Sequence, residues 1–324
     1  MTRAGEGNVR FDRPVRVASR DVERVWGGQR LRPADPPVGE VWLVSGDAEI
    51  IAGPGVGKTL DATVQMHGAE FLGRAWPRAD RFPLLVKLID AAGWLSLQVH
   101  PDDARAIALE GPDARGKSEA WHVLEAAPGA EVMAGFDKPV ELSVLDHPDA
   151  HGTLVSATRR FGVRPGDTLY LPAGTIHALG PDVVLYEVQQ PSDITYRIYD
   201  WGRAPSEARP LHVVQARAAI HPAIRVAPVP LPEPAAGQWV DLVTCPHFRL
   251  DMVTLDDEPA LPYREGDGCH VLTVVGGVAT ISGDGWGERL GRHESLVMPA
   301  RIGKYVLRGE PGSRVLRAAP PVPA

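Results

Sequence analysis

The sequence predicts a mostly β protein with few and short helices, because turn-forming residues are frequent and apolar residues gather in short runs. The 324-residue chain contains 34 glycines and 31 prolines, together about a fifth of all residues, against an average of about 12%. Apolar runs such as 183–185 and 271–275 have the length and β-branched character of strands. A chain of this length can bury a large core and commonly forms two domains.

The first strand that carries polar chemistry is predicted over 97–100, just before Pro101-Asp102-Asp103. Because successive side chains of a strand point to opposite faces, Gln98 and His100 should project together into the space that the sheet encloses. The acidic residues that follow can cap a short helix over 104–110, ended by a Gly-Pro pair. This helix would fix the chain just beyond His100.

A second strand is predicted over 116–124, after a turn rich in Gly, Pro and Asp. Its period of two places Lys117, Glu119 and Trp121 on one face, so an ammonium group points the same way as a carboxylate. A solvated Lys-Glu pair of little energetic value would have the same pattern. This strand alone therefore does not establish a site.

A third motif consists of Gly166, five further residues, and then Pro172-x-Gly174-x-x-His177. The spacing fits a turn that enters a strand whose histidine returns to a barrel interior. A single histidine on a strand is usually a hydrogen-bonded structural residue, so the combination of motifs carries the interpretation. The string resembles the second sequence motif of cupins.

Residues 187–203 are unusually dense in polar and aromatic side chains, among them Asp193 and Arg197. Loops held by a rigid scaffold often carry chemistry; a surface turn with an Asp-Arg pair is the alternative. A further helix is predicted over 210–217, where the apolar spacing indicates packing on the barrel.

A proline-rich stretch over 227–237 should be extended and unable to join a central strand. We therefore predict an N-terminal catalytic domain over 1–226, a linker over 227–237 and a C-terminal domain over 238–324. In the last of these, apolar runs at 248–255, 271–276 and 294–300 predict a second, smaller barrel. Pro299 resembles Pro172, but no histidine follows at the matching distance, so this barrel is expected to lack metal ligands.

As a set, the motifs resemble type I mannose-6-phosphate isomerases (phosphomannose isomerases) of the cupin superfamily, over most of residues 20–220. The likeness is carried by Val25-Trp26-Gly27-Gly28, Gly39-Glu40-Val41-Trp42, Phe82 to Lys87, Leu95 to Asp103, Gly116 to Trp121, Pro172 to His177, and Glu187 to Arg203. Too few residues separate Glu119 from His177 for the extra helical domain of long members, so the chain resembles the short bacterial form. The family's usual Ser-Trp-Glu reads Val41-Trp42-Leu43 here, which bears on substrate preference.

The resemblance implies two cupin-type β-barrels and an aldose-ketose isomerase that interconverts D-mannose 6-phosphate and D-fructose 6-phosphate through a cis-enediolate. It implies one zinc ion per chain, held by Gln98, His100, Glu119 and His177. It also implies that Lys117, Asp193 and Arg197 lie around the substrate, and we take these three as the catalytic candidates. Lys87 and Arg197 are candidates for binding the substrate.

Each catalytic candidate suits a different task. A desolvated Lys117 beside Zn²⁺ would have a lowered pKa and could transfer protons. Asp193 is the second candidate, for proton exchange during ring opening. Arg197, planar and permanently charged, suits holding an enediolate oxygen or a phosphate.

Two other classes of protein fit part of the pattern. A cupin non-haem Fe(II) oxygenase could use His100, Glu119 and His177, and a non-catalytic sugar-binding bicupin could keep only the barrel. Neither would need Lys117 or Arg197.

Composition excludes several partners. A formal net charge of -7 gives no reason to expect nucleic acid or an anionic membrane. Two cysteines, Cys245 and Cys269, are too few for a disulfide framework, and we find neither a secretory signal nor a run of about 18 apolar residues. We expect a cytoplasmic monomer or weak homodimer whose partner is a small phosphorylated sugar.

Overall fold

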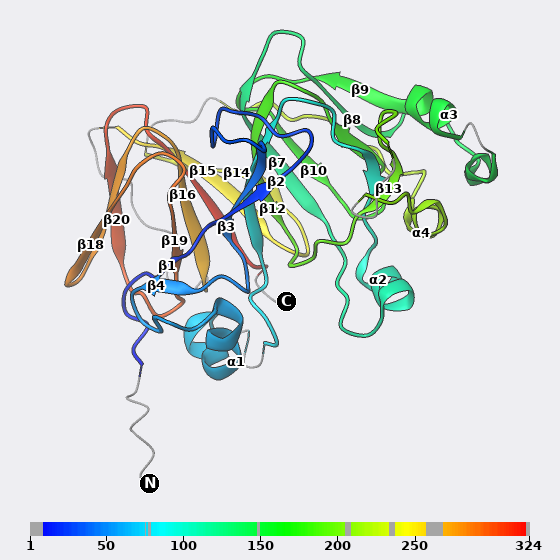
Figure 1. The fold of residues 1–324 in the computed structure, drawn as a ribbon. Coiled ribbons are helices and arrows are strands. Elements are labelled where there is room, and N and C mark those ends of the chain that lie inside the picture. Colours follow the sequence, from blue (N-terminus) through cyan, green and yellow to red (C-terminus); the bar gives the residue numbers. More distant parts are fainter. Residues whose placement is uncertain are drawn as a thin grey trace. The chain divides into compact units, whose positions relative to one another are not determined.

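The computed structural model describes residues 9–321 except 75, 77–78, 148–149, 205–208, 233–236 and 257–267. Within these ranges the chain consists mostly of antiparallel strands, with four α-helices and one short 3-10 helix (Figure 1). The predicted fold class, mostly β with two jelly-roll modules and few short helices, is confirmed. None of the described helices combines the length and the apolar character that crossing a bilayer requires.

The chain divides into two compact units. Unit 1 comprises residues 1–20, 43–84 and 232–324, and unit 2 comprises residues 21–42 and 85–231. The chain passes from unit 2 back to unit 1 between Leu231 and Pro232, inside the proline-rich stretch. Residues 233–236 of that stretch lie outside the described part of the chain. The division into continuous domains over 1–226 and 238–324 stays a prediction.

Two antiparallel sheets form most of unit 2. The six-stranded sheet has the order β10 (Thr168–Leu171), β7 (Glu119–Ala126), β12 (Val183–Gln189), β5 (Leu85–Ala91), β3 (Val38–Val44), β2 (Arg20–Glu23). The five-stranded sheet has the order β13 (Tyr196–Tyr199), β6 (Leu97–Val99), β11 (His177–Leu179), β8 (Glu131–Phe136), β9 (Thr158–Gly162).

Apolar side chains pack the inner faces of these two sheets together. Ile89 and Leu185 of the six-stranded sheet belong to one buried cluster with Val132 and Leu179 of the five-stranded sheet. The outer face of the five-stranded sheet packs against helices α3 (Ala150–Ala157) and α4 (Val213–Ala219). Leu97 and Val99 belong to that outer cluster, as expected if Gln98 between them faces inward.

The two predicted helices of unit 2 are present with adjusted bounds. Helix α2 spans Asp103–Glu110, and the side chain of Asp102 caps it by accepting a hydrogen bond from the backbone N of Arg105 at 2.8 Å. The helix predicted over 210–217 is α4, which begins only after His212. Between β8 and α3 lies a 3-10 helix, Leu142–Asp146.

Strand register aligns polar side chains in two rows. In the five-stranded sheet, Gln98 pairs with both Arg197 and His177 on the neighbouring strands. In the six-stranded sheet, Glu187 pairs with Lys87 and with Trp121, two residues beyond Glu119. Each row interrupts an apolar inner face, so unit 2 has a polar region between its sheets.

Unit 1 repeats the architecture on a smaller scale. Its five-stranded sheet has the order β14 (Trp239–Thr244), β15 (Arg249–Thr254), β21 (Arg314–Ala319), β16 (His270–Gly276), β19 (Ser295–Met298). A three-stranded sheet has the order β18 (Trp286–Leu290), β17 (Ala279–Gly283), β20 (Tyr305–Gly309). A two-stranded sheet pairs β1 (Arg16–Val17) with β4 (Ile50–Ala52), and unit 1 also contains helix α1 (Leu60–Phe71). The strands predicted in the C-terminal part are therefore present.

Candidate active site

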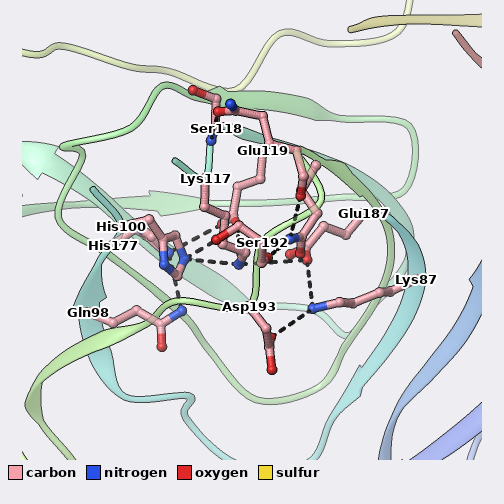
Figure 2. Close-up of polar contacts among 12 residues, drawn as sticks. Lys87, Gln98, His100, Lys117, Ser118, Glu119, His177, Glu187, Ser192 and Asp193 are labelled. Carbon is pink, nitrogen blue, oxygen red and sulfur yellow. Dashed lines mark hydrogen bonds and ion pairs between the residues drawn. The ribbon is translucent and has the colours of Figure 1, made fainter. Parts of the chain in front are cut away.

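Three buried side chains of unit 2 bring potential metal ligands together (Figure 2). His177 Nε2 lies 3.3 Å from Glu119 Oε1, and His100 Nε2 lies 3.4 Å from Glu119 Oε2. Their ligand atoms all lie within 4.8 Å of one another. In the part of the chain that the structure describes, this is the one group of three or more His, Cys, Asp or Glu residues with such spacing.

Both imidazoles are held so that Nε2 offers a lone pair. His100 Nδ1 donates to the carbonyl oxygen of Ile194 at 2.7 Å, and His177 Nδ1 donates to that of Thr175 at 2.8 Å. Such bonds select the tautomer with the proton on Nδ1. Burial and the nearby Lys117 ammonium lower the pKa of His100 to about 3, and burial lowers the pKa of His177, so both rings are neutral.

The residues present fit a metal ion. Glu119 Oε1 is buried and accepts no hydrogen bond, although an unsatisfied buried acceptor costs free energy. Gln98 places its amide 3.3 Å from His177 Nε2, and the oxygen and nitrogen of an amide are interchangeable by rotation, so it can supply a further oxygen. Two imidazoles, one carboxylate and one amide form a donor set suited to a divalent cation.

Two glycines let the surrounding loops close on the site. A Cβ on Gly116 would lie 2.5 Å from the backbone N of Asp103, so the turn before Lys117 packs directly on the start of α2. Gly174 has φ +90° and donates its N–H to the carbonyl oxygen of His100 at 2.8 Å. The glycine of the Pro172 to His177 string thus ties that turn to the end of β6.

Lys117 lies against the ligand group, although it precedes β7 and is not part of that strand. Its Nζ is 2.6 Å from Glu119 Oε2, 3.1 Å from His100 Nε2 and 4.0 Å from Glu187 Oε1. Burial opposes its charge, but Glu119 and Glu187 outweigh burial and raise the pKa of Lys117. This direction is the effect of the chain's own charged groups; the lowered pKa expected for Lys117 beside Zn²⁺ stays a prediction.

Glu187 also adjoins the ligand group, although its residue type and position had suggested no role. Its Oε2 accepts a hydrogen bond from Trp121 Nε1 at 2.7 Å, while its buried Oε1 has no hydrogen-bond donor. Burial and the neighbouring Glu119 raise the pKa of Glu187. A carboxylate in the otherwise apolar run 183–188 was the signal that could have found it.

Lys87 is buried among carboxylates. Its Nζ lies 3.6 Å from Glu187 Oε1 and 3.7 Å from Asp193 Oδ1 (Figure 2). It also lies 3.6 Å from Glu40 Oε2. Its observed partners are therefore anions of the chain itself, and substrate binding by Lys87 stays a prediction. The side chain of Asp193 is 57% exposed, so this carboxylate is accessible to solvent.

Glu40, in the Gly39 to Trp42 motif, is a buried ion-pair partner of Lys87. It accepts hydrogen bonds from Arg24 Nε at 2.7 Å and from Trp42 Nε1 at 2.8 Å. Burial opposes ionisation, but Lys87 and Arg24 outweigh it and lower the pKa of Glu40 to about 2. Glu40 is therefore a buried anion that holds two cations.

A cavity of about 360 Å³ adjoins these groups, a size suited to a small ligand. Of the predicted site residues, Lys87, Gln98, Lys117, Asp193 and Arg197 line it, whereas His100, Glu119 and His177 do not. Residues given no role from sequence also line it: Arg24, Glu40, Trp121, Glu187, Arg209 and His212.

Comparison with known proteins gives concordant results. Residues 21–127 match the family model of the phosphomannose isomerase type I catalytic domain. The chain is 32% identical over 305 residues to a probable mannose-6-phosphate isomerase, GmuF, of Bacillus subtilis, covering 89% of this chain and 93% of that protein. It is 35% identical over 241 residues to mannose-6-phosphate isomerase of Streptococcus mutans, covering 71% and 72% of the two chains.

The fold is shared with a solved structure. The crystal structure of mannose 6-phosphate isomerase from Bacillus subtilis superposes with a TM-score of 0.81 at 27% identity, covering 94% of this chain and 99% of that one.

We expect Glu119→Gln to weaken divalent metal binding at least about tenfold, because it removes the one anionic donor of the group. Metal content after equilibrium dialysis measures this. The exposed Glu131→Gln is the matched control and should bind like the wild type. Equal metal content in wild type and Glu119→Gln would show that the ion lies elsewhere.

We also expect a pH-dependent loss of stability in Glu40→Gln. Because the folded-state pKa of about 2 lies below the ordinary 4.5, ionised Glu40 stabilises the fold above pH 4.5, and this contribution declines as the pH falls toward 2. The substitution should therefore lower the free energy of unfolding by about 3 kcal/mol near pH 7. In urea unfolding the difference from wild type should shrink from pH 5 to pH 3. A difference that stays constant over that range contradicts the assignment; exposed Glu141→Gln is the control.

Proposed function

The chain belongs to the type I phosphomannose isomerase family, and we propose that it interconverts D-mannose 6-phosphate and D-fructose 6-phosphate. The observation that carries the proposal is the buried group of His100, Glu119 and His177 in direct contact with Lys117, which lines a cavity of small-ligand size. The names of the curated relatives supply the substrate. The geometry supplies groups for proton transfer and charge stabilisation.

We propose one zinc ion per chain, held by Gln98, His100, Glu119 and His177. Two imidazoles with mixed oxygen donors suit Zn²⁺, and an amide in place of a second carboxylate keeps the net charge of the site positive once the ion is bound. Such an ion supplies positive charge that stabilises negative charge developing on the sugar oxygens. The hydrogen bonds from both Nδ1 atoms orient the rings for this task.

Aldose-ketose isomerisation moves a proton from C2 to C1 of the aldose, so the site needs a proton acceptor beside a group that donates to oxygen. Lys117 Nζ contacts the ligand group and lines the cavity, so in its protonated form it can donate to a sugar oxygen. Glu187 is an acceptor with a raised pKa, and a base whose pKa lies nearer the working pH returns the proton more readily. Asp193, half exposed, can exchange a proton with the ring oxygen when the sugar ring opens.

Arg197 is assigned to hold an oxygen of the substrate, because its guanidinium stays charged and presents a planar set of donors. The expectations of a cytoplasmic protein and of a monomer or weak homodimer stay predictions.

The proposal is tested by a coupled assay of mannose 6-phosphate conversion to fructose 6-phosphate, before and after removal of metal with a chelator. We expect turnover that is lost with the metal and returns when Zn²⁺ is added. Full activity after complete metal removal, or consumption of O2 with no isomerisation, would contradict it.

Within that assay, Lys117→Met should lower kcat by about 10²- to 10⁴-fold, the usual contribution of a positioned proton-transfer group. Metal content must be measured in parallel, because Lys117 contacts two ligand residues. If Lys117→Met and Arg197→Ala both retained wild-type turnover with metal bound, the proposed mechanism would be wrong.

A further inference from the structure

Arginine side chains gather at one part of the cavity wall. Arg24, Arg197 and Arg209 line the same cavity as Lys117. Arg203 joins this group because it shares the carboxylate of Asp200 with Arg209. Arg209 donates to Asp200 from Nε at 2.9 Å and from a terminal nitrogen at 2.8 Å, and Arg203 donates to it at 2.9 Å. All of these residues belong to unit 2.

This group carries more positive than negative charge. Its four guanidinium groups face two carboxylates, Asp200 and Glu40, and Glu40 is shared with Lys87. The crowding of cations is reflected at Arg197, whose pKa is lowered by burial and then by Arg209, Arg24 and Arg203, against the effect of Asp200. Two positive charges are left without an anion of the chain.

One donor of the group is buried without an acceptor. Arg197 donates from its terminal nitrogen to the carbonyl oxygen of Pro210 at 2.9 Å, but its Nε is shielded from solvent and has no hydrogen-bond partner within the described ranges. The backbone N–H of Arg197 donates to His212 Nδ1 at 3.3 Å, so this imidazole is held at the same wall. The guanidinium of Arg197 lines the cavity and is only partly satisfied by the described residues.

Lys87 does not provide the excess charge. Three carboxylates lie within 3.7 Å of its Nζ, and an incoming anion would have to compete with all of them. The guanidinium groups are also better matched to phosphate, because their planar donors form paired, charge-assisted hydrogen bonds.

We infer that Arg24 and Arg209, together with Arg197, bind the phosphate group of the substrate. The inference rests on the proposed function for the identity of that substrate. A phosphate monoester carries about -1.5 to -2 charges near pH 7, which matches the unbalanced charge of the group. Asp200 acts as a positioning residue, because its two hydrogen bonds with Arg209 fix the plane of that guanidinium before the ligand arrives.

The test compares Arg209→Gln and Arg24→Gln with the metal-loaded wild type. Loss of a charge-assisted hydrogen-bonding group should raise KM for mannose 6-phosphate about 10- to 100-fold, with kcat changed by less than about threefold if binding is lost equally in ground and transition states. The dissociation constant of inorganic phosphate, measured by calorimetry on the same proteins, should rise by a similar factor. Arg160→Gln is the matched control, since Arg160 also pairs with a carboxylate, Glu131, but does not line the cavity.

The result that overturns the inference is an Arg209→Gln protein with wild-type KM and wild-type affinity for phosphate. A fall in kcat at unchanged KM would also overturn it. Arg209→Lys, which keeps the charge but not the planar donors, should fall between wild type and Arg209→Gln, and circular dichroism checks that each variant is folded. Failure of the proposed function can be distinguished from failure of this inference. A wild-type protein that binds phosphate through Arg209 but does not isomerise mannose 6-phosphate would contradict the proposed function and would still support the phosphate site.

Discussion

The buried negative charge of Glu119 is the constraint on which the site depends. A carboxylate removed from water is tolerated only where opposite charges and hydrogen-bond donors replace the solvent. Lys117 meets this need on one side, and the two neutral imidazoles leave the other side open to a cation. From Glu119 an unbroken sequence of alternating charges continues through the interior: Lys117, Glu187, Lys87, Glu40 and Arg24.

This alternation links the two ends of the cavity electrostatically. A member that loses its charge leaves its neighbours unbalanced in a buried region, where solvent cannot compensate. The carboxylates around Lys117 raise its pKa against the effect of burial. Burial and Glu119 raise the pKa of Glu187, although Lys117 and Lys87 oppose this. The alternation also separates two kinds of cation in one cavity: lysines surrounded by carboxylates of the chain, and arginines that outnumber their carboxylate partners.

Sequence predicted those parts of the site that follow from local pattern. Gln98 and His100 share a face because strands have a period of two, and the spacing of Pro172, Gly174 and His177 fits a turn into a strand. The partners of Lys87 could not be predicted, because Glu40 and Glu187 reach it only through pairing between strands that are distant in sequence. Arg209 had no local signal at all, since it lies in a loop without periodicity and its role depends on Asp200.

The polar rows across the two sheets have a consequence for folding. Because side chains alternate along a strand, a displacement of β12 by one residue would replace its interior carboxylate by an apolar side chain and turn the charge to the opposite face, which is also buried. Misaligned chains would therefore be inert and would not act as slower or less selective catalysts. Correct strand register and a complete site therefore form together in this unit.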